Sequence, residues 1–237
     1  MHAIGLSSAI YLLFLLVLAP VMSFRSARAF NAPPDDAGAQ AVPPLTTLYA
    51  NSLVLLAVLF ALAWFTARTF AYEIFSAPHI GSRDVLAGAA ALGFQFAMQF
   101  VSHAVRTPGE REAMAANRLM PRTVGERVLY SAASLAAGVS EEAAYRGVLT
   151  TVLWYAIGSP WIATAISALA FALGHALQGW KSMAVIFLMA CAMQLLVWYT
   201  GTLVIAMAVH AVYDLLAPTV RRRTWPAPPT GPERSAG

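Results

Sequence analysis

The segment from Ala137 to Leu149 places charged residues inside a run that is otherwise apolar enough to span a membrane. On insertion scales, one charged side chain at the centre of a bilayer helix costs about 2.5 to 3.5 kcal/mol. Glu141, Glu142 and Arg146 therefore need a shared site lined by protein or water. In a helix, Glu142 and Arg146 are spaced i and i+4 with the acid first, which favours an ion pair on one face. The side chain of Glu141 points about 100° away from that of Glu142, toward a neighbouring face of the helix, where it is free to meet groups from another helix.

The composition assigns the rest of the chain to the same environment. Of the 237 residues, 59% are hydrophobic and 11% are charged, whereas about 25% are charged in a typical soluble domain. We therefore predict an all-α, polytopic integral membrane protein. Its single cysteine, Cys191, excludes an internal disulfide framework and a cysteine-rich zinc site.

About seven transmembrane helices are expected from the apolar runs, with Pro218 ending the last one. We expect the first run to be retained as a span, although Ala27-Arg28-Ala29 resembles a signal-peptide cleavage site. The charged segment that contains Glu110 to Leu119 is expected to form a short surface helix. The predicted spans are 6–24, 45–65, 85–103, 126–157, 161–177, 182–200 and 203–217. These give four regions: helices 1–3 at 1–104, a cytoplasmic loop at 105–125, a catalytic core at 126–217, and a basic, Pro-rich disordered tail at 218–237.

The distribution of Lys and Arg predicts the orientation. Twelve of these residues fall on the side that holds the loops after spans one, three and five and the tail; only Arg68 and Arg83 fall on the other side. The positive-inside rule therefore places the N-terminus outside and the C-terminus in the cytoplasm. The net charge of +4 follows from this topology and gives no support for nucleic-acid binding.

Two histidines and one more acid lie on the fifth and seventh predicted spans. His175 falls on span five, one turn after Phe171, and His210 falls on span seven, one turn before Asp214. Ionisable groups inside a bilayer usually mark functional sites. We therefore expect the acids of span four to meet these side chains in a cavity between helices 4, 5 and 7.

Two chemistries fit such a set of residues. A carboxylate beside an imidazole can deprotonate a water that attacks a peptide bond, while a second imidazole stabilises the oxyanion. Alternatively, Glu141, His175, His210 and Asp214 could bind zinc, leaving one ligand position for water. There is no His-Glu-x-x-His motif and no convincing serine nucleophile. The spacing alone does not choose between the two chemistries.

The ordered motifs resemble those of a known family. Glu141-Glu142-x-x-x-Arg146, Phe171-x-x-x-His175 and His210-x-x-x-Asp214, in that order on spans four, five and seven, are similar to the motifs of the CPBP intramembrane proteases. This group includes the CAAX-processing endopeptidase Rce1 and the bacterial Abi-type immunity proteins. The resemblance covers about residues 120–217.

The resemblance implies a role for each residue. Glu141 and His175 would activate the water, Glu142 and Arg146 would hold the site in shape, and His210 with residue 214 would stabilise the oxyanion. Many family members have Asn at the last position, where this chain has Asp214. An ionised Asp accepts hydrogen bonds and donates none. Asp214 therefore fits orienting His210, or binding a metal, better than it fits donating to an oxyanion.

The resulting prediction is an intramembrane endopeptidase that acts near the C-terminus of a membrane-associated protein or peptide. The enzyme would either need no cofactor or use a bound zinc ion, and it would lie in a bacterial inner membrane. Two alternatives stay open: a non-cleaving immunity or binding protein on the same scaffold, and a proton-coupled transporter component. The sequence does not distinguish CAAX-like processing from sorting-signal removal or bacteriocin immunity, and it does not give the oligomeric state.

Overall fold

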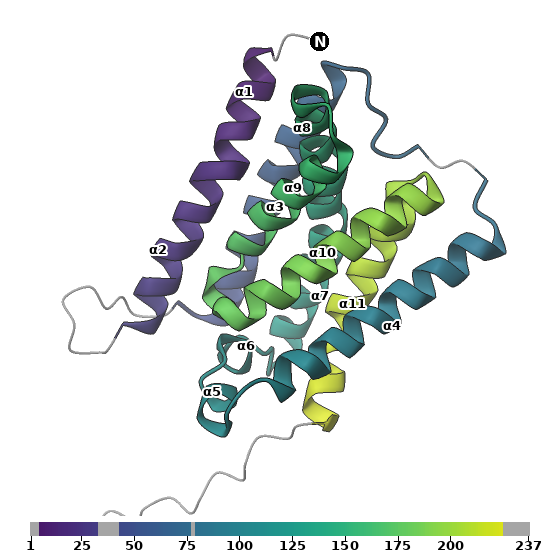
Figure 1. Ribbon diagram of the computed structural model, residues 1–237. Coiled ribbons are helices and arrows are strands. Elements are labelled where there is room, and N and C mark those ends of the chain that lie inside the picture. Colours follow the sequence, from purple (N-terminus) through teal and green to yellow (C-terminus); the bar gives the residue numbers. More distant parts are fainter. Residues whose placement is uncertain (1–4, 33–42, 77–78, 225–237) are drawn as a thin grey trace, which may run out of the picture.

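The computed structural model describes residues 5–32, 43–76 and 79–224, and all regular structure in these ranges is helical. The chain starts with one continuous helix, drawn in purple in Figure 1, that changes from α to π geometry and back. Its parts are α1 (Leu6–Leu13), η1 (Phe14–Leu18) and α2 (Ala19–Asn31).

Two long helices and two short ones follow. They are α3 (Leu45–Arg68), α4 (Ser82–Ala104), α5 (Pro108–Glu112) and α6 (Ala115–Arg118). A second continuous helix consists of α7 (Val124–Glu141), the π-helix η2 (Glu142–Leu149) and α8 (Thr150–Ile157). The remaining elements are α9 (Pro160–Leu173), the short 3₁₀-helix η3 (Ala176–Gln178), α10 (Trp180–Thr200) and α11 (Leu203–Thr224).

Five of these helices are long and apolar enough to cross a membrane: α1–η1–α2, α3, α4, α10 and α11. In the most apolar stretch of each, only 11% to 28% of the residues are buried inside the protein. Most of their apolar side chains therefore point outward, as expected for contact with lipid. The chain is an all-α polytopic membrane protein, as predicted.

The other two predicted spans are helices of a different kind. The α7–η2–α8 helix crosses the bundle but carries the charged residues of the 141–146 motif. Helix α9 has 14 residues, which is about 21 Å at 1.5 Å per residue, shorter than a bilayer core of about 30 Å. The turn predicted at Gly158-Ser159-Pro160 is present. Gly158 ends α8 with φ 78°, a left-handed conformation that favours glycine.

The close packing of α7 on α11 determines where the motifs meet. Helix α7 packs between α3 and α11, and Gly138 lies at the contact. A Cβ added to Gly138 would lie 2.8 Å from the Ala211 backbone nitrogen and from the Met207 carbonyl oxygen. Glycine therefore permits a close approach one turn before Glu142 and beside His210.

The prediction that Pro218 ends the last helix is wrong. Helix α11 continues through Pro218 to Thr224. Proline lacks the N–H that would bond to the carbonyl of Asp214, four residues earlier. The Tyr130 hydroxyl of α7 donates to that carbonyl instead, at 2.8 Å. Because the orphaned carbonyl keeps a partner, the helix tolerates the proline. The predicted tail region 218–237 thus begins as helix, and residues 225–237 lie outside the described ranges.

The segment between α4 and α7 also differs from the prediction. Instead of one surface helix over Glu110 to Leu119, it contains α5 and α6, separated at Ala113 and Met114. Thr107 caps α5 by accepting from the Glu110 N–H, and Glu110 caps the Thr107 N–H in return. In Figure 1 both short helices lie at the lower end of the bundle, beside the end of α11.

Candidate active site

The charged motif lies where the long central helix changes to π geometry. All eight residues of η2, from Glu142 to Leu149, are buried. A π segment within an α-helix is uncommon and occurs often at functional sites. The change of geometry turns Glu142 and Arg146 into the bundle.

Side chains from four other helical segments donate hydrogen bonds to carbonyl oxygens of η2. The Tyr11 hydroxyl donates to Ala144 O at 2.8 Å, and the Ser167 hydroxyl donates to Tyr145 O at 2.8 Å. In the amide orientation that satisfies its neighbours, Gln194 donates to Arg146 O at 3.3 Å. The Thr151 hydroxyl donates to Gly147 O at 2.7 Å. These bonds from α1, α9, α10 and α8 compensate the altered backbone pattern and fix its position.

Glu142 and Arg146 form the predicted ion pair. Arg146 Nη1 lies 3.3 Å from Glu142 Oε1, and the two side chains are 4% and 0% exposed. The guanidinium also stacks over the Phe171 ring, with 4.1 Å between Cζ and the ring centroid. Phe171 in turn meets Tyr145 edge-on at 5.0 Å between centroids. The other Glu142 oxygen, Oε2, is buried and accepts no hydrogen bond from the described residues.

The His210 ring lies close to all three acids of the motifs, which are Glu141, Glu142 and Asp214. Its Nδ1 lies 2.7 Å from Glu142 Oε1. A carboxylate only accepts, so Nδ1 is the donor. On the other side of the ring, Nε2 lies 3.7 Å from Glu141 Oε2 and 3.6 Å from Asp214 Oδ2. These distances exceed a hydrogen bond, so Nε2 faces two carboxylates without being bonded to either.

His175 is not on the fifth helix, where the sequence predicted it. Helix α9 ends at Leu173, and His175 lies in the turn before η3 with φ −103° and ψ 25°. Its Nδ1 lies 2.8 Å from the Phe171 carbonyl oxygen, which can only accept. The proton is therefore on Nδ1, and a neutral ring presents Nε2 as an acceptor.

Ser23 of α2 holds the turn that carries His175. Its hydroxyl donates to Gly174 O at 2.6 Å and accepts from Ala176 N at 3.2 Å. One side chain thus bonds to the residues on both sides of His175. Sequence reasoning missed Ser23, because a serine in an apolar run gives no signal of a partner 150 residues away.

A cavity of about 160 Å³ brings the two histidines together. It is lined from η2 by Glu142 and Arg146, from the α9 end by Phe171 and His175, and from α11 by His210 and Asp214. Helices α4 and α10 close the other sides. Glu141 lies behind His210, with its side chain 20% exposed.

The six predicted site residues therefore form one cluster, but not with every expected contact. Among the ion pairs and hydrogen bonds of the described residues, none joins Glu141 to His175. Instead, Glu141 and Glu142 both lie close to His210. No group of three or more His, Cys, Asp or Glu side chains in the described ranges is placed to hold a metal ion. The predicted zinc ligands Glu141, His175, His210 and Asp214 thus do not fit a zinc site.

Comparison with protein families identifies the part of the chain that holds this cluster. Residues 124–216, from the start of α7 nearly to Pro218, match the model described as type II CAAX prenyl endopeptidase Rce1-like. These residues are an Rce1-like domain. The suspected relation to the CAAX-processing proteases is confirmed, and it supports a membrane endopeptidase of the CAAX type. No curated protein and no solved structure matches the chain significantly.

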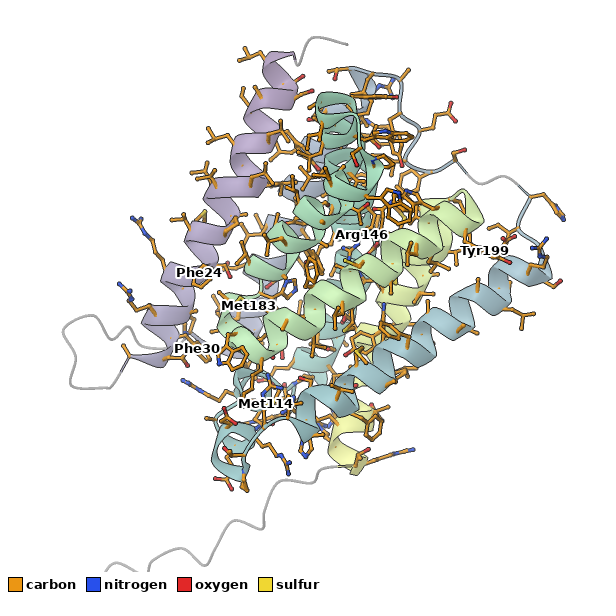
Figure 2. All side chains as sticks on the ribbon, viewed as in Figure 1. Phe24, Phe30, Met114, Arg146, Met183 and Tyr199 are labelled. Carbon is orange, nitrogen blue, oxygen red and sulfur yellow. The ribbon has the colours of Figure 1, made fainter. Side chains whose placement is uncertain are left out.

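The Rce1-like domain contains all six motif residues but not all of their supports. Tyr11, which bonds to η2, and Ser23, which holds the His175 turn, come from the first helix, outside the matched range. Figure 2 shows Arg146 in the middle of the bundle, with Phe24 of the first helix on the flank. The first helix therefore belongs to the structure of the site.

Proposed function

We propose that this protein is an intramembrane endopeptidase that cleaves near the C-terminus of a membrane-associated protein or peptide with an activated water. The observation that carries the proposal is the pair of imidazoles that line one cavity, each with Nδ1 bonded to a fixed acceptor. Both rings are thereby oriented with Nε2 available for chemistry. The Rce1-like match supports the same class of reaction.

His175 is suited to take a proton from the water. The bond from its Nδ1 to Phe171 O leaves the Nε2 lone pair as the basic site. Ser23 and the Phe171 ring, whose centroid lies 4.6 Å from that of His175, restrict how the imidazole can move. A fixed base loses little entropy when it reaches the transition state.

Glu141 is better suited than Glu142 to assist as a base. Glu142 Oε1 already meets both the Arg146 guanidinium and the His210 Nδ1–H, so its charge is compensated and its role is to hold the site in shape. Among the described residues Glu141 has no guanidinium partner, and its side chain is 20% exposed. With Nε2 protonated, His210 would donate to the developing oxyanion, as in other preorganised sites.

Asp214 would then orient His210 rather than donate to the substrate. It lies 3.6 Å from His210 Nε2, on the same ring nitrogen that Glu141 approaches. Asparagine at this position could donate an N–H, whereas ionised aspartate cannot. This chain would therefore rely on His210 alone for the oxyanion donor that the family motif shares between two residues.

The setting of the reaction follows from the basic residues. We place the enzyme in a bacterial inner membrane. Its C-terminus would lie in the cytoplasm, because twelve Lys and Arg residues lie on that side of the predicted topology. Its partners would be the lipid bilayer and a protein or peptide substrate at the membrane. No step of the proposed reaction passes through a metal ion.

The test compares the C-terminal peptides of membranes that contain the wild-type protein, Glu141→Gln or Asp214→Asn. Glu141→Gln keeps the shape and loses the base, so we expect loss of turnover in a folded protein. Asp214→Asn is expected to retain or increase activity. Identical C-terminal peptides with wild type and Glu141→Gln would contradict the proposal. A dead Asp214→Asn variant that had lost zinc present in the wild type would favour the metal mechanism instead.

The immunity and transporter alternatives predict other results. A binding protein on the same scaffold would keep its protective effect in Glu141→Gln, since binding needs the shape of the site and not its base. A proton-coupled transporter would change membrane proton flux without producing any new C-terminus. The same set of variants therefore separates all three functions.

A further inference from the structure

The cavity continues from the acids to the end of the bundle that carries α5 and α6. Beyond Asp214, its lining includes Ser102 and His103 of α4, Met114, and Arg221 of α11. Figure 2 shows Arg146 in the middle of the bundle and Met114 near its lower end. One cavity therefore joins the catalytic cluster to a second, distinct set of polar groups.

This second end of the cavity is cationic. Arg106 donates to the Ser102 hydroxyl at 2.6 Å and to the Ser182 hydroxyl at 2.7 Å, and Arg111 Nε donates to His103 O at 3.1 Å. Arg221 acts on both Arg106 and His103 through its charge. In the described ranges, no carboxylate lies within 4 Å of any of the three guanidiniums of Arg106, Arg111 and Arg221.

Glu110 of α5, an acid at this end of the bundle, is paired elsewhere. Glu110 Oε1 lies 2.8 Å from Lys181 Nζ. The hydrogen bond from Lys181, with that from the Thr107 N–H, lowers the pKa of Glu110 to about 2. Glu110 is therefore ionised and paired with Lys181. Its charge also acts on Arg106, but it forms no ion pair with Arg221 within 4 Å. Unlike Arg146, which pairs with Glu142, Arg221 lines the cavity without an ion-pair partner among the described residues.

The guanidinium of Arg221 has only a weak hydrogen-bond acceptor among the described residues. Its Nη2 contacts Met114 Sδ at 3.1 Å, and a thioether is a weak acceptor. A guanidinium matches a carboxylate with two parallel, charge-assisted hydrogen bonds. We propose that Arg221 binds the free C-terminal carboxylate of the peptide that is cleaved. This inference rests on the proposed function and adds the recognition element of that site.

The geometry also predicts how much peptide lies beyond the cleaved bond. Along α11, Arg221 follows Asp214 by seven residues and His210 by eleven, which is about 10 to 16 Å at 1.5 Å per residue. An extended peptide covers this span with about three to five residues, at about 3.3 Å each. The released fragment should fall in that range.

The experiment uses two matched pools of octapeptides with a fluorophore at the N-terminus. The last four positions are drawn from Ala, Val, Leu, Ile, Ser and Met, and the pools differ only in ending as a free acid or an amide. Binding is measured by fluorescence polarisation to the full chain in zwitterionic nanodiscs, in a Glu141→Gln background that prevents turnover. We expect the amide pool to bind about 10- to 100-fold more weakly, the usual effect of losing a charge-assisted hydrogen bond.

Two variants in the same background identify the residue responsible. Arg221→Gln should abolish the preference for the acid pool, whereas Arg223→Gln, an exposed arginine two residues away, should retain it. Equal binding of the two pools by the parent protein, or binding of neither, would overturn the proposal. A preference that survives in Arg221→Gln would do the same. So would equal binding of the pools together with Arg221-dependent binding to anionic lipid, which would assign the arginine to a lipid head group.

Cleavage is measured separately, with wild-type protein and mass spectrometry of the same pools. Preferential binding of the acid pool without any cleavage would contradict the proposed function and leave the carboxylate site supported. Cleavage of both pools at equal kcat/KM would support the protease and overturn the role of Arg221.

Discussion

Glu142 is the residue on which the shape of the site depends most. It is fully buried, and its Oε1 contacts Arg146 and His210. A buried charge is tolerated when it is paired, and removing one partner leaves the other uncompensated. The bond between His210 and Glu142 therefore holds α11 against η2, and Arg146 compensates the charge of Glu142. The stability of this protein should be more sensitive to Arg146 than to the partly exposed Glu141.

The first prediction follows from this difference. Arg146→Ala should lower the free energy of unfolding by about 3 to 5 kcal/mol, because it leaves the buried Glu142 with only its His210 contact. Glu141→Ala should cost less, since Glu141 has no partner closer than 3.7 Å among its ion pairs. Thermal unfolding of both variants in the same detergent measures the difference. Equal melting temperatures would contradict the structural role of Arg146.

The elements contribute two devices that local sequence does not announce. The first is the α7–α11 contact at Gly138, which brings Glu142 within reach of His210. The second is the bond from α2 to the His175 turn. Each depends on one small residue. Gly138 lies one turn before Glu142, and Ser23 lies in a helix that carries none of the catalytic motifs.

Gly138→Ala should therefore damage both stability and activity. The added methyl group would lie 2.8 Å from backbone atoms of α11, so the helices must separate, which typically costs about 1 to 3 kcal/mol. Gly125→Ala is the matched control, since a Cβ at Gly125, in the same helix, has no atom within 4 Å. Activity and melting temperature should fall only in Gly138→Ala. Normal activity in that variant would show that the close approach is not needed.

Ser23→Ala should reduce kcat more than it changes KM. It removes both hydrogen bonds that flank His175, and each is worth about 0.5 to 1.5 kcal/mol, so we expect a loss of about tenfold in kcat. Ser23→Thr keeps the hydroxyl and should recover activity. Ser52→Ala, which removes a bond within its own helix, is the control. A lower melting temperature of Ser23→Ala with unchanged kcat would assign Ser23 a purely structural role.

At the scale of the whole molecule, the distribution of Lys and Arg predicts which end of the helix bundle lies on the cytoplasmic side of the membrane. Glu73, between α3 and α4, and Thr224, at the end of α11, are both exposed and lie on opposite sides of the predicted topology. The asymmetry of Lys and Arg places Thr224 inside. This orientation also places the cationic end of the cavity, with Arg221, on the cytoplasmic side.

Labelling of single cysteines tests the orientation. In a Cys191→Ala background, Glu73→Cys should react with an impermeant maleimide in intact cells, whereas Thr224→Cys should react only after the cells are opened. Each variant controls for the expression of the other. The reverse pattern would invert the topology and place the Arg221 end of the cavity on the outer side of the membrane.

The sequence by itself determined the class of fold, the order of the helices and the identity of the six clustered residues. It could do so because the cost of burying charge in lipid makes Glu141, Glu142, Arg146, His175, His210 and Asp214 conspicuous in apolar runs. Their spacing along a helix also predicted the Glu142–Arg146 pair. These are properties of local composition and helical periodicity, which need no knowledge of how helices pack.

Only the tertiary structure decided what the residues touch. It placed His175 in a turn rather than on a helix, because Ser23 from the first helix supplies the bonds that a continued helix would have made. It carried α11 past Pro218, because Tyr130 satisfies the carbonyl that proline cannot. It also placed Glu141 beside His210 and not beside His175, and it brought Arg221 into the cavity that His210 lines. Each outcome depends on a hydrogen bond or contact between segments far apart in the chain, and helical periodicity carries no record of such partners.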